Sequence, residues 1–301
     1  MYNPQLETFL KVADAGSFNK AAEESFITPT AVIKQINLLE DSLDVKLFER
    51  THRGLQLTKA GESLYRDAKY IIQYCRDSVT RAKNAMKKDT DVIRIGVSPM
   101  TPAQILVELW PKIHKFSPEL KFQMIPFENT PENAREILTN LGKNIDIVAG
   151  LFDENMFGLS QCKGFEISRD PICCAVSLQH RLADKTKLTI KDLYGENLML
   201  IHRGWSSYVD RLRDDIWTNH SQINIIDFDF YNTEVFNRCE NSNDILMAVE
   251  QWSNVHPLLK IIPVEWDYLI PYGILYASKP SDTVKRFLTA AKEAINENSE
   301  R

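Results

Sequence analysis

Cysteine is scarce and without pattern in this chain of 301 residues. The five cysteines are an odd number, and their spacing matches no zinc motif, so the sequence predicts neither a disulfide framework nor a structural metal site. Their positions are Cys75, Cys162, Cys173, Cys174 and Cys239. Reduced thiols are typical of an intracellular compartment. We therefore expect a cytoplasmic protein with no metal and no other cofactor.

Long apolar runs are also missing. No stretch approaches the roughly 20 apolar residues that cross a bilayer. The first residues, MYNPQLETFLKV, have neither the basic start nor the apolar run of a signal peptide. We expect no membrane partner. The chain has 44% hydrophobic and 26% charged residues, which is ordinary for a globular protein with a buried core, and its length suggests two or three domains.

Basic residues are fewer than acidic residues overall, but the balance differs between the two ends of the chain. The formal net charge is −5. Residues 1–88 contain 14 Lys/Arg and 11 Asp/Glu, whereas residues 89–301 contain 22 and 30. A weakly basic head can meet phosphates while an acidic body is repelled by them. The asymmetry favours double-stranded DNA as a partner of the head.

Residues 1–58 have the outline of a helix-turn-helix followed by a wing. A first helix with apolar residues at helical spacing ends at Gly16, and a short second helix contains Ala21 and Ala22. Thr28 and Pro29 then signal a third helix, because a threonine hydroxyl caps free amides and proline fits a first helical turn. This order predicts a helix that is presented to the major groove.

The third helix has two different faces. Its predicted buried stripe is Val32, Ile36, Leu39 and Leu43. The opposite face carries Thr30, Ile33, Lys34 and Asn37. Short polar groups and a cation near the helix start suit the reading of base edges. An ordinary solvated face is the alternative, but the capped helix start and the basic hairpin that follows favour DNA.

A basic hairpin follows the third helix. Strand-like runs at residues 46–49 and 55–58 flank a turn at Gly54. Arg50 and Arg53 would lie at its tip, where arginines can bind phosphates or enter a narrow minor groove. The hairpin is therefore predicted to be a DNA-binding wing.

Two segments of the head carry a specific resemblance: LETFLKVADAGSFNKAAEESFIT and AVIKQINLLEDSLDVKLFERTHRGLQLTKAG. They resemble the LysR-type transcriptional regulators over the whole head. The resemblance implies that Thr28, Pro29, Thr30, Ile33 and Lys34 face DNA, with Arg53 on the wing. The family commonly has Gln-Pro-Ala-Leu-Ser-Arg where this chain has PTAVIK. Base-reading groups therefore differ, and the target sequence cannot be transferred from relatives.

Residues 59–89 are predicted to form one long linker helix. Apolar residues spaced three or four apart make a single seam: Leu64, Ala68, Ile71, Cys75, Val79, Ala82 and Met86. An isolated helix cannot cover such a seam, so we expect a homodimer, with packing against the chain's own body as the alternative. A dimer suits DNA with two half-sites about one helical turn apart.

Strand-like and helical runs alternate through residues 90–301, which predicts parallel sheets with helices on both faces. Two lobes are expected, the first from residues 90–161 and 267–301 and the second from residues 162–266. The segments IRIGVS, NIDIVAG and HRLADKTKLTIKDLYGENLMLI resemble the effector domain of LysR-type regulators, which is similar in fold to periplasmic solute-binding proteins. The resemblance implies an α/β multidomain regulator with a small-molecule effector, a tetramer of two dimers, and contact with RNA polymerase.

The resemblance also places a cleft between the two lobes. Its predicted residues are Ser98, Pro99, Met100, Thr101 and Phe152 on the first lobe, and Arg203, Trp205 and Ser206 on the second. Helix starts offer amides to an anion, and an arginine can bind a carboxylate with two hydrogen bonds. A small anionic effector is therefore expected, unless the hydroxyls only cap helices. The family's Gly-rich turn near residues 244–252 is replaced by EQWSNVH, so this part of the cleft should differ.

Two other functions compete with this interpretation. A thiol redox sensor would use Cys162, Cys173 or Cys174, which have Lys163 and Arg169 nearby in sequence. An enzyme would need a catalytic motif, and the sequence contains no nucleophile elbow, phosphate-binding Gly loop or zinc helix. The sequence as a whole favours a sequence-specific DNA-binding regulator.

Overall fold

The structure is a computed structural model that describes residues 2–51, 54–85, 91–153 and 162–299. The chain divides into two compact units, Met1–Met86 and Lys87–Arg301. Among the described residues, none of the helices combines the length and the apolar character needed to cross a membrane.

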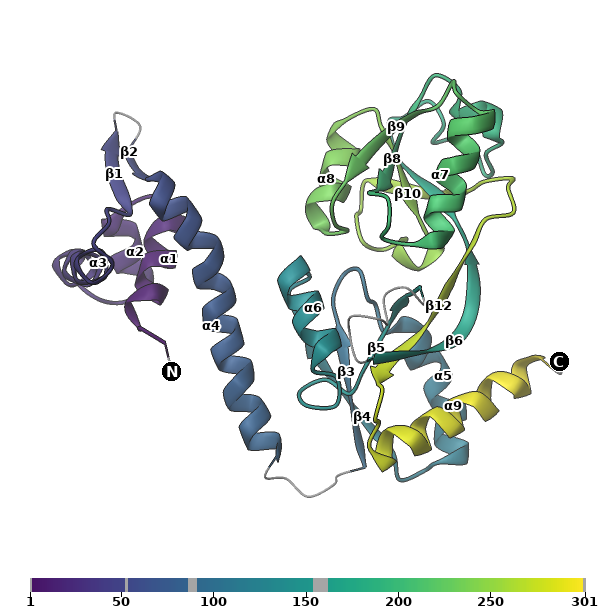
Figure 1. The fold of residues 1–301 in the computed structure, drawn as a ribbon, viewed down its shortest axis with the longest axis horizontal. Helices are drawn as coiled ribbons and strands as arrows, with labels where there is room; N and C mark the ends of the chain where they lie inside the picture. The colour runs from purple at the N-terminus through teal and green to yellow at the C-terminus, as the bar shows by residue number, and fades with distance from the viewer. Residues whose placement is uncertain (1, 52–53, 86–90, 154–161, 300–301) are drawn as a thin grey trace. The chain divides into compact units, whose positions relative to one another are not determined.

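The first unit is a winged helix-turn-helix with a long helix attached (Figure 1). Its elements are α1 (Gln5–Ala15), α2 (Phe18–Glu24), α3 (Pro29–Leu43), β1 (Phe48–Thr51), β2 (Gly54–Leu57) and α4 (Lys59–Ala85). Gly16 ends α1 in the left-handed conformation, as its position predicts. The wing strands pair antiparallel, Phe48 opposite Leu57, so β1 begins two residues later than predicted.

The core of the first unit lies between α1, α3 and the start of α4. Phe9, Val12 and Val32 are fully buried there. The predicted stripe on α3 is buried as far as Leu39, but Leu43 is exposed. The reason is that α3 ends at this residue, and Asp44, which follows, has the left-handed conformation that stops the helix.

Helix α4 does not carry one uniform seam. Ala68 and Ile72 are buried in the core of the first unit, so this turn of the helix packs against its own chain. Ile71 and Val79 are each 39% exposed. Among the described residues, the predicted seam is therefore open to a partner from Ile71 onward, because Leu64 and Ala68 pack in the core of the first unit.

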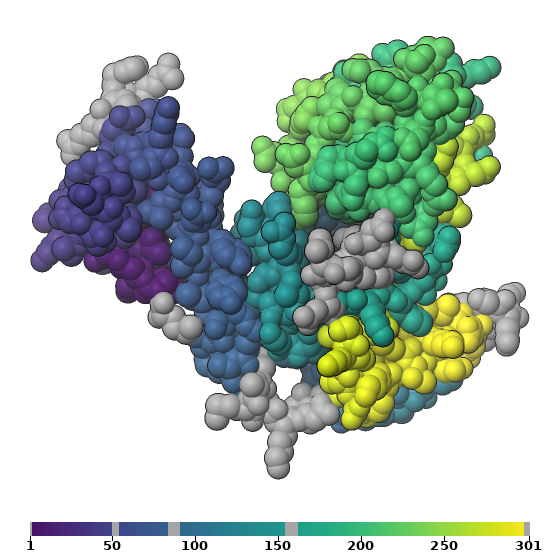
Figure 2. All heavy atoms as spheres, viewed as in Figure 1, coloured from purple at the N-terminus to yellow at the C-terminus, as the bar shows by residue number. Residues whose placement is uncertain are grey.

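The second unit begins with a lobe built on one sheet, in the strand order β4-β3-β5-β12-β6. Its elements are β3 (Val92–Val97), α5 (Gln104–Phe116), β4 (Lys121–Pro126), α6 (Pro131–Thr139), β5 (Ile147–Leu151), β6 (Cys162–Pro171), β12 (Leu269–Ala277) and α9 (Asp282–Ser299). Every residue of β5 is buried. Val148 faces the cluster that includes α6, whereas Ile147 and Ala149 belong to the core shared with α5 and α9. Helix α9 forms part of this lobe's outer surface (Figure 2).

The second lobe has the strand order β11-β7-β10-β8-β9. Its elements are β7 (Cys173–Ser177), β8 (Asn197–Ile201), α7 (Ser207–Asn219), β9 (Asn224–Phe228), α8 (Thr233–Asn241), β10 (Ile245–Ala248) and β11 (Leu259–Pro263), with 3₁₀ turns η2 (Ile190–Leu193) and η3 (Glu250–Trp252). Strands β7 and β10 are buried along their whole length, as expected for the centre of a sheet covered on both faces.

Two features differ from the sequence-based prediction. Both sheets are mixed rather than parallel, because β12 runs antiparallel to β5 and β6, and β7 runs antiparallel to β10 and β11. Residues 162–171 were assigned to the second lobe, but as β6 they pair with β12 in the first sheet. These long strands run between the lobes (Figure 1). The alternation of strands and helices cannot reveal a strand that returns to an earlier sheet.

A glycine lets the two long strands approach each other. The register of β6 and β12 shifts between Tyr272 and Gly273. A Cβ atom at Gly273 would lie 2.1 Å from the carbonyl oxygen of Phe165, which no side chain can tolerate. The bulge therefore depends on glycine at this position.

Candidate DNA-binding face and effector pocket

The start of α3 has the geometry that the sequence predicts. Thr28 is the N-cap, and its side-chain oxygen accepts a hydrogen bond from the Ala31 amide at 3.2 Å, with Pro29 in the first turn. The predicted reading face is open to solvent: Pro29, Thr30, Ile33, Lys34 and Asn37 are all exposed. The structure brings these five residues together on one side of one helix.

The wing is anchored to the end of α3 by a buried carboxylate. Glu40 accepts hydrogen bonds from the Leu47 amide at 2.8 Å and from Lys46 Nζ at 2.6 Å. Burial alone would raise the pKa of Glu40, but the bonds from Lys46 and from backbone amides lower it below its ordinary value. Arg50 lies on β1, with its backbone opposite Leu55. Arg53 lies outside the described residues.

The turn between α2 and α3 contains a residue in an unfavourable conformation. Phe26 has φ of +56°, a left-handed backbone that aromatic residues rarely adopt. Its side chain is 96% exposed, so no packing compensates for the strain. Nothing in the sequence pattern predicted this feature.

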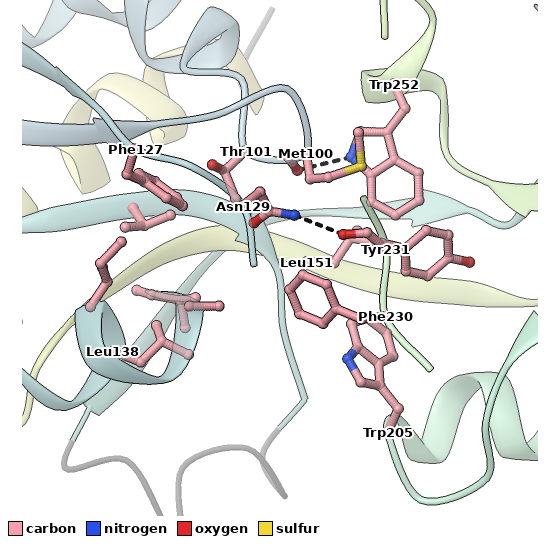
Figure 3. Close-up of a pocket in the computed structure, with 14 residues that line it drawn as sticks. Met100, Thr101, Phe127, Asn129, Leu138, Leu151, Trp205, Phe230, Tyr231 and Trp252 are labelled. Atoms are coloured by element: carbon pink, nitrogen blue, oxygen red, sulfur yellow. Dashed lines mark hydrogen bonds between the residues drawn. The ribbon is translucent and has the colours of Figure 1, made fainter. Parts of the chain in front are cut away.

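A pocket of about 120 Å³ lies between the lobes of the second unit (Figure 3). It is lined by Met100, Thr101, Phe127, Asn129, Ala134, Ile137, Leu138, Val148, Leu151, Trp205, Phe230, Tyr231, Trp252 and Leu275. Of the residues predicted for the cleft, Met100, Thr101 and Trp205 are among these. The lining is mainly aliphatic and aromatic.

Hydrogen bonds join the two lobes beside this pocket. Asn129 donates to the carbonyl oxygen of Tyr231 at 2.7 Å, and Trp252 Nε1 donates to the carbonyl oxygen of Met100 at 3.0 Å (Figure 3). The Tyr231 hydroxyl donates to the Met247 carbonyl oxygen at 2.9 Å, and burial raises the pKa of this tyrosine well above its ordinary value. Tyr231 therefore contributes its ring to the pocket wall, whereas its hydroxyl stays protonated and bonded to Met247.

An acidic residue of the protein itself binds the N-terminus of α7. Asp153, which follows β5 in the first lobe, is 2% exposed. Its carboxylate accepts hydrogen bonds at 2.7 Å from both the amide and the hydroxyl of Ser207, and at 3.2 Å from the Ser206 hydroxyl. Ser206 is also the N-cap of α7. The site predicted to attract an effector anion thus holds an internal one.

Other predicted cleft residues lie in different surroundings. Ser98 and Thr101 lie between β3 and α5, where the sequence predicts a strand to give way to a helix. Their hydroxyls are 2.8 Å apart in a tight turn, and α5 starts only at Gln104. Arg203 forms an exposed ion pair with Asp214 on α7. Phe152 is buried in the cluster next to α6, and Pro99 is exposed.

Several pocket residues were missed by sequence reasoning. Aromatic residues that directly follow strands supply much of the wall: Phe127 after β4, and Phe230 and Tyr231 after β9. Trp252 belongs to the EQWSNVH segment that departs from the family pattern, and it occupies the part of the cleft where a different shape was expected. The sequence also did not predict a role for Asp153, which directly follows the predicted cleft residue Phe152. Aromatic residues just past strand ends were the available signal.

The cysteines of the second unit are free and buried. Burial raises the pKa of Cys162 and Cys174, and it raises that of Cys173 to about 11 and that of Cys239 to about 12. Such shifts oppose the thiolate that a redox sensor requires. Over the ranges that the structure describes, no group of three His, Cys, Asp or Glu side chains is placed to hold a metal ion.

Comparison with known families gives two matches that together cover most of the chain. Residues 4–62 match the bacterial regulatory helix-turn-helix protein, lysR family, and residues 87–295 match the LysR substrate binding domain. The boundary between the two matches falls where the chain divides into its two compact units.

Individual relatives agree with these matches. The chain is 26% identical to the uncharacterized HTH-type transcriptional regulator YvbU of Bacillus subtilis, over 72% of each chain. It is 27% identical to the HTH-type transcriptional regulator CysL of the same organism, over 68% of this chain and 66% of the relative. The solved structure of CbnR, a LysR family transcriptional regulator, shares the fold, with a TM-score of 0.55 at 18% identity over 98% of this chain and 99% of that one. The chain therefore belongs to the LysR family and is a transcriptional regulator with a DNA-binding helix-turn-helix domain and an effector-binding domain.

Proposed function

We propose that α3 enters the DNA major groove and reads a specific site. The observation that carries this proposal is the exposed face of α3, which begins at the Thr28 cap. Lys34 and Asn37 supply a cation and an amide for base edges, and Ile33 supplies an apolar surface for a thymine methyl group. Arg50 and Arg53 on the wing bind the backbone or the minor groove.

The test begins with selection of preferred sites from a random double-stranded DNA library by the full-length protein. Binding of the selected site is then measured for Lys34→Ala and for Lys121→Ala, a matched lysine that is exposed on β4 in the second unit. Loss of a base contact should weaken binding by about 1–3 kcal/mol, roughly 5- to 150-fold, and relax the preference at one position. The Lys121→Ala variant should bind like the parent protein. Unchanged affinity and unchanged preference for both Lys34→Ala and Asn37→Ala would contradict the assignment.

We infer that two chains pair through the exposed part of α4. Ile71 and Val79 are two turns apart on this helix, and Tyr70 and Tyr74 extend the exposed apolar surface. An aspartate at Ile71 should shift the protein toward monomer in sedimentation velocity runs, whereas Arg66→Asp, at an exposed position outside the seam, should leave the mass unchanged. A dimer of unaltered stability in the Ile71→Asp variant would exclude this surface.

We further propose that a small effector binds the interlobe pocket and changes the balance between two lobe arrangements. The aromatic and aliphatic lining supports binding, and among the described lining residues no pair of titratable groups could exchange a proton with a substrate. An effector needs only different affinities for two assemblies to alter DNA binding. Pairing of dimers into a tetramer, contact with RNA polymerase and action in the cytoplasm belong to the same proposal, which the family relationship supports.

A further inference from the structure

We propose that the interlobe pocket accepts an uncharged, apolar molecule about the size of one aromatic ring. This inference rests on the proposed role of the pocket as the effector site and specifies the chemistry of the ligand. It replaces the anionic effector expected from the sequence.

The size of the pocket limits the ligand to a small molecule. The cavity volume is about 120 Å³. An apolar cavity of about 150 Å³ in another protein is enough to bind benzene. A single ring, or a branched alkyl group of similar volume, therefore matches the volume of this pocket.

The walls suit an aromatic ring. Trp205 and Tyr231 are packed with their ring centroids 5.9 Å apart, and those of Tyr231 and Trp252 are 4.6 Å apart, both in tilted or edge-to-face geometry. Such rings prefer further aromatic neighbours in the same arrangements. Because Tyr231 and Trp252 belong to the second lobe and Leu138 and Val148 to the first, one ring in the pocket would contact both lobes.

The charges around the pocket disfavour an anion. Among the described lining residues there is no arginine, lysine or histidine. Arg203, the cation expected to bind a carboxylate, is paired with Asp214 on the surface. The start of α7 is already neutralised by Asp153. A buried carboxylate without a partner is costly, so a charged ligand would lose much of its affinity.

Three polar side chains of the lining have partners within the chain. The Asn129 amide donates to the Tyr231 carbonyl oxygen, the Thr101 hydroxyl is bonded to Ser98, and Trp252 Nε1 donates to the Met100 carbonyl oxygen. Polar groups that already have partners gain little from water in the pocket, which favours an apolar occupant. The ligand class therefore follows from the volume, the aromatic walls and the missing cation together.

The test uses full-length protein and two probes, benzene and benzoate, which differ by a carboxylate. Binding is followed by tryptophan fluorescence and by the NMR signal of the Met100 methyl group, which lines the pocket. Benzene should bind saturably, and benzoate at least 10-fold more weakly. Ala134→Trp, which fills the pocket from α6, should abolish benzene binding, and the milder Leu138→Phe should weaken it. Benzoate binding as tight as benzene binding, or no saturable binding of benzene, would overturn the proposal.

A second variant tests the part played by Asp153. In Asp153→Ala the start of α7 loses its internal anion, so benzoate should bind at least 10-fold more tightly than it does to the parent protein, while benzene should bind as before. No gain for benzoate would overturn the explanation of charge selectivity. Benzene binding without any change in affinity for the selected DNA would refute the effector role of the pocket and leave its ligand chemistry supported, so the two failures are distinguishable.

Discussion

Helices α3 and α7 begin in the same way and lie in opposite surroundings. Each has a hydroxyl N-cap that accepts a hydrogen bond from a backbone amide, Thr28 from Ala31 and Ser206 from Tyr208. The start of α3 is exposed, whereas Ser206 is buried against the carboxylate of Asp153. A helix start is therefore open to a phosphate or carboxylate ligand only where no acidic side chain of the same protein lies there first.

The largest loss of function is expected when α3 receives an acidic residue of its own. Thr30→Asp should weaken binding to the selected DNA about 100-fold or more, because like charges placed together cost several kcal/mol. An acidic residue in a first turn stabilises a helix, so the loss would not reflect unfolding. Thr30→Asn, of similar shape without the charge, should lose far less. Equal losses in an electrophoretic or anisotropy titration would refute a contact between the start of α3 and phosphate.

The converse change removes the acidic residue from α7. Asp153→Ala should lower the free energy of unfolding of the second unit by about 2–3 kcal/mol, because an amide and two hydroxyls lose a charged acceptor. All five tryptophans lie in this unit, so urea denaturation followed by tryptophan fluorescence reports on it alone. Asp214→Ala removes the exposed pair with Arg203 and should cost far less, because exposed ion pairs contribute little to stability. Similar costs for both would show that Asp153 is not a structural anchor.

A third change concerns the far end of α3, where the buried acidic residue holds the wing. Because the pKa of Glu40 is lowered in the folded protein, its stabilising effect is present above the unfolded value of roughly 4.3 and is lost as pH falls through the folded value. Glu40→Gln should cost about 1.5–2 kcal/mol at pH 7 and progressively less toward pH 3. Amide hydrogen exchange in α1 and α3 measures this difference. Asp41→Asn, exposed on the same helix, is the control, and a cost that does not vary with pH would contradict the role of the carboxylate.

The smallest effect is expected at the residue two positions before each N-cap, where both helices have a backbone with positive φ. Gly204 has φ of +90° before Ser206, and Phe26 has φ of +56° before Thr28. Glycine tolerates this backbone, whereas phenylalanine does not. Phe26→Asn should stabilise the first unit by roughly 0.5–1 kcal/mol, since asparagine adopts the left-handed region more readily. A destabilised variant in the same exchange experiment would mean that the exposed ring has a stabilising contact.

The sequence predicted the fold where local signals decide it. The Thr28-Pro29 start, the stop at Gly16 and the alternation of strands and helices depend on nearby residues, and the structure contains all three. The membership of β6 in the first sheet depends on pairing with β12, about 100 residues later in the chain, and no local pattern encodes that partner. The sequence also did not predict which part of the α4 seam stays exposed, because the burial of Ala68 and Ile72 depends on contacts with α1.

The candidate site was predicted less completely for a related reason. Met100, Thr101 and Trp205 were found because they follow strands in a known order. The family resemblance places Arg203 in the cleft, where its charge suits a carboxylate, yet that charge is paired with Asp214, which is 11 residues further along the chain. The sequence pattern does not single out Asp153, although it lies next to Phe152. The partner of a charged group is set by tertiary structure, so its type and position in the sequence do not reveal what it binds.

The length of α4 has a mechanical consequence. With 27 residues and a rise of 1.5 Å for each, the helix is about 40 Å long. Its first turns are fixed to the reading head through Ala68 and Ile72, so head and helix must tilt as one lever. A tilt of only about 10° would carry the head roughly 7 Å, which is about two base-pair steps along DNA. In the proposed dimer, a small rotation at the distant end of this lever would thus be enough to bring a head into or out of phase with its half-site.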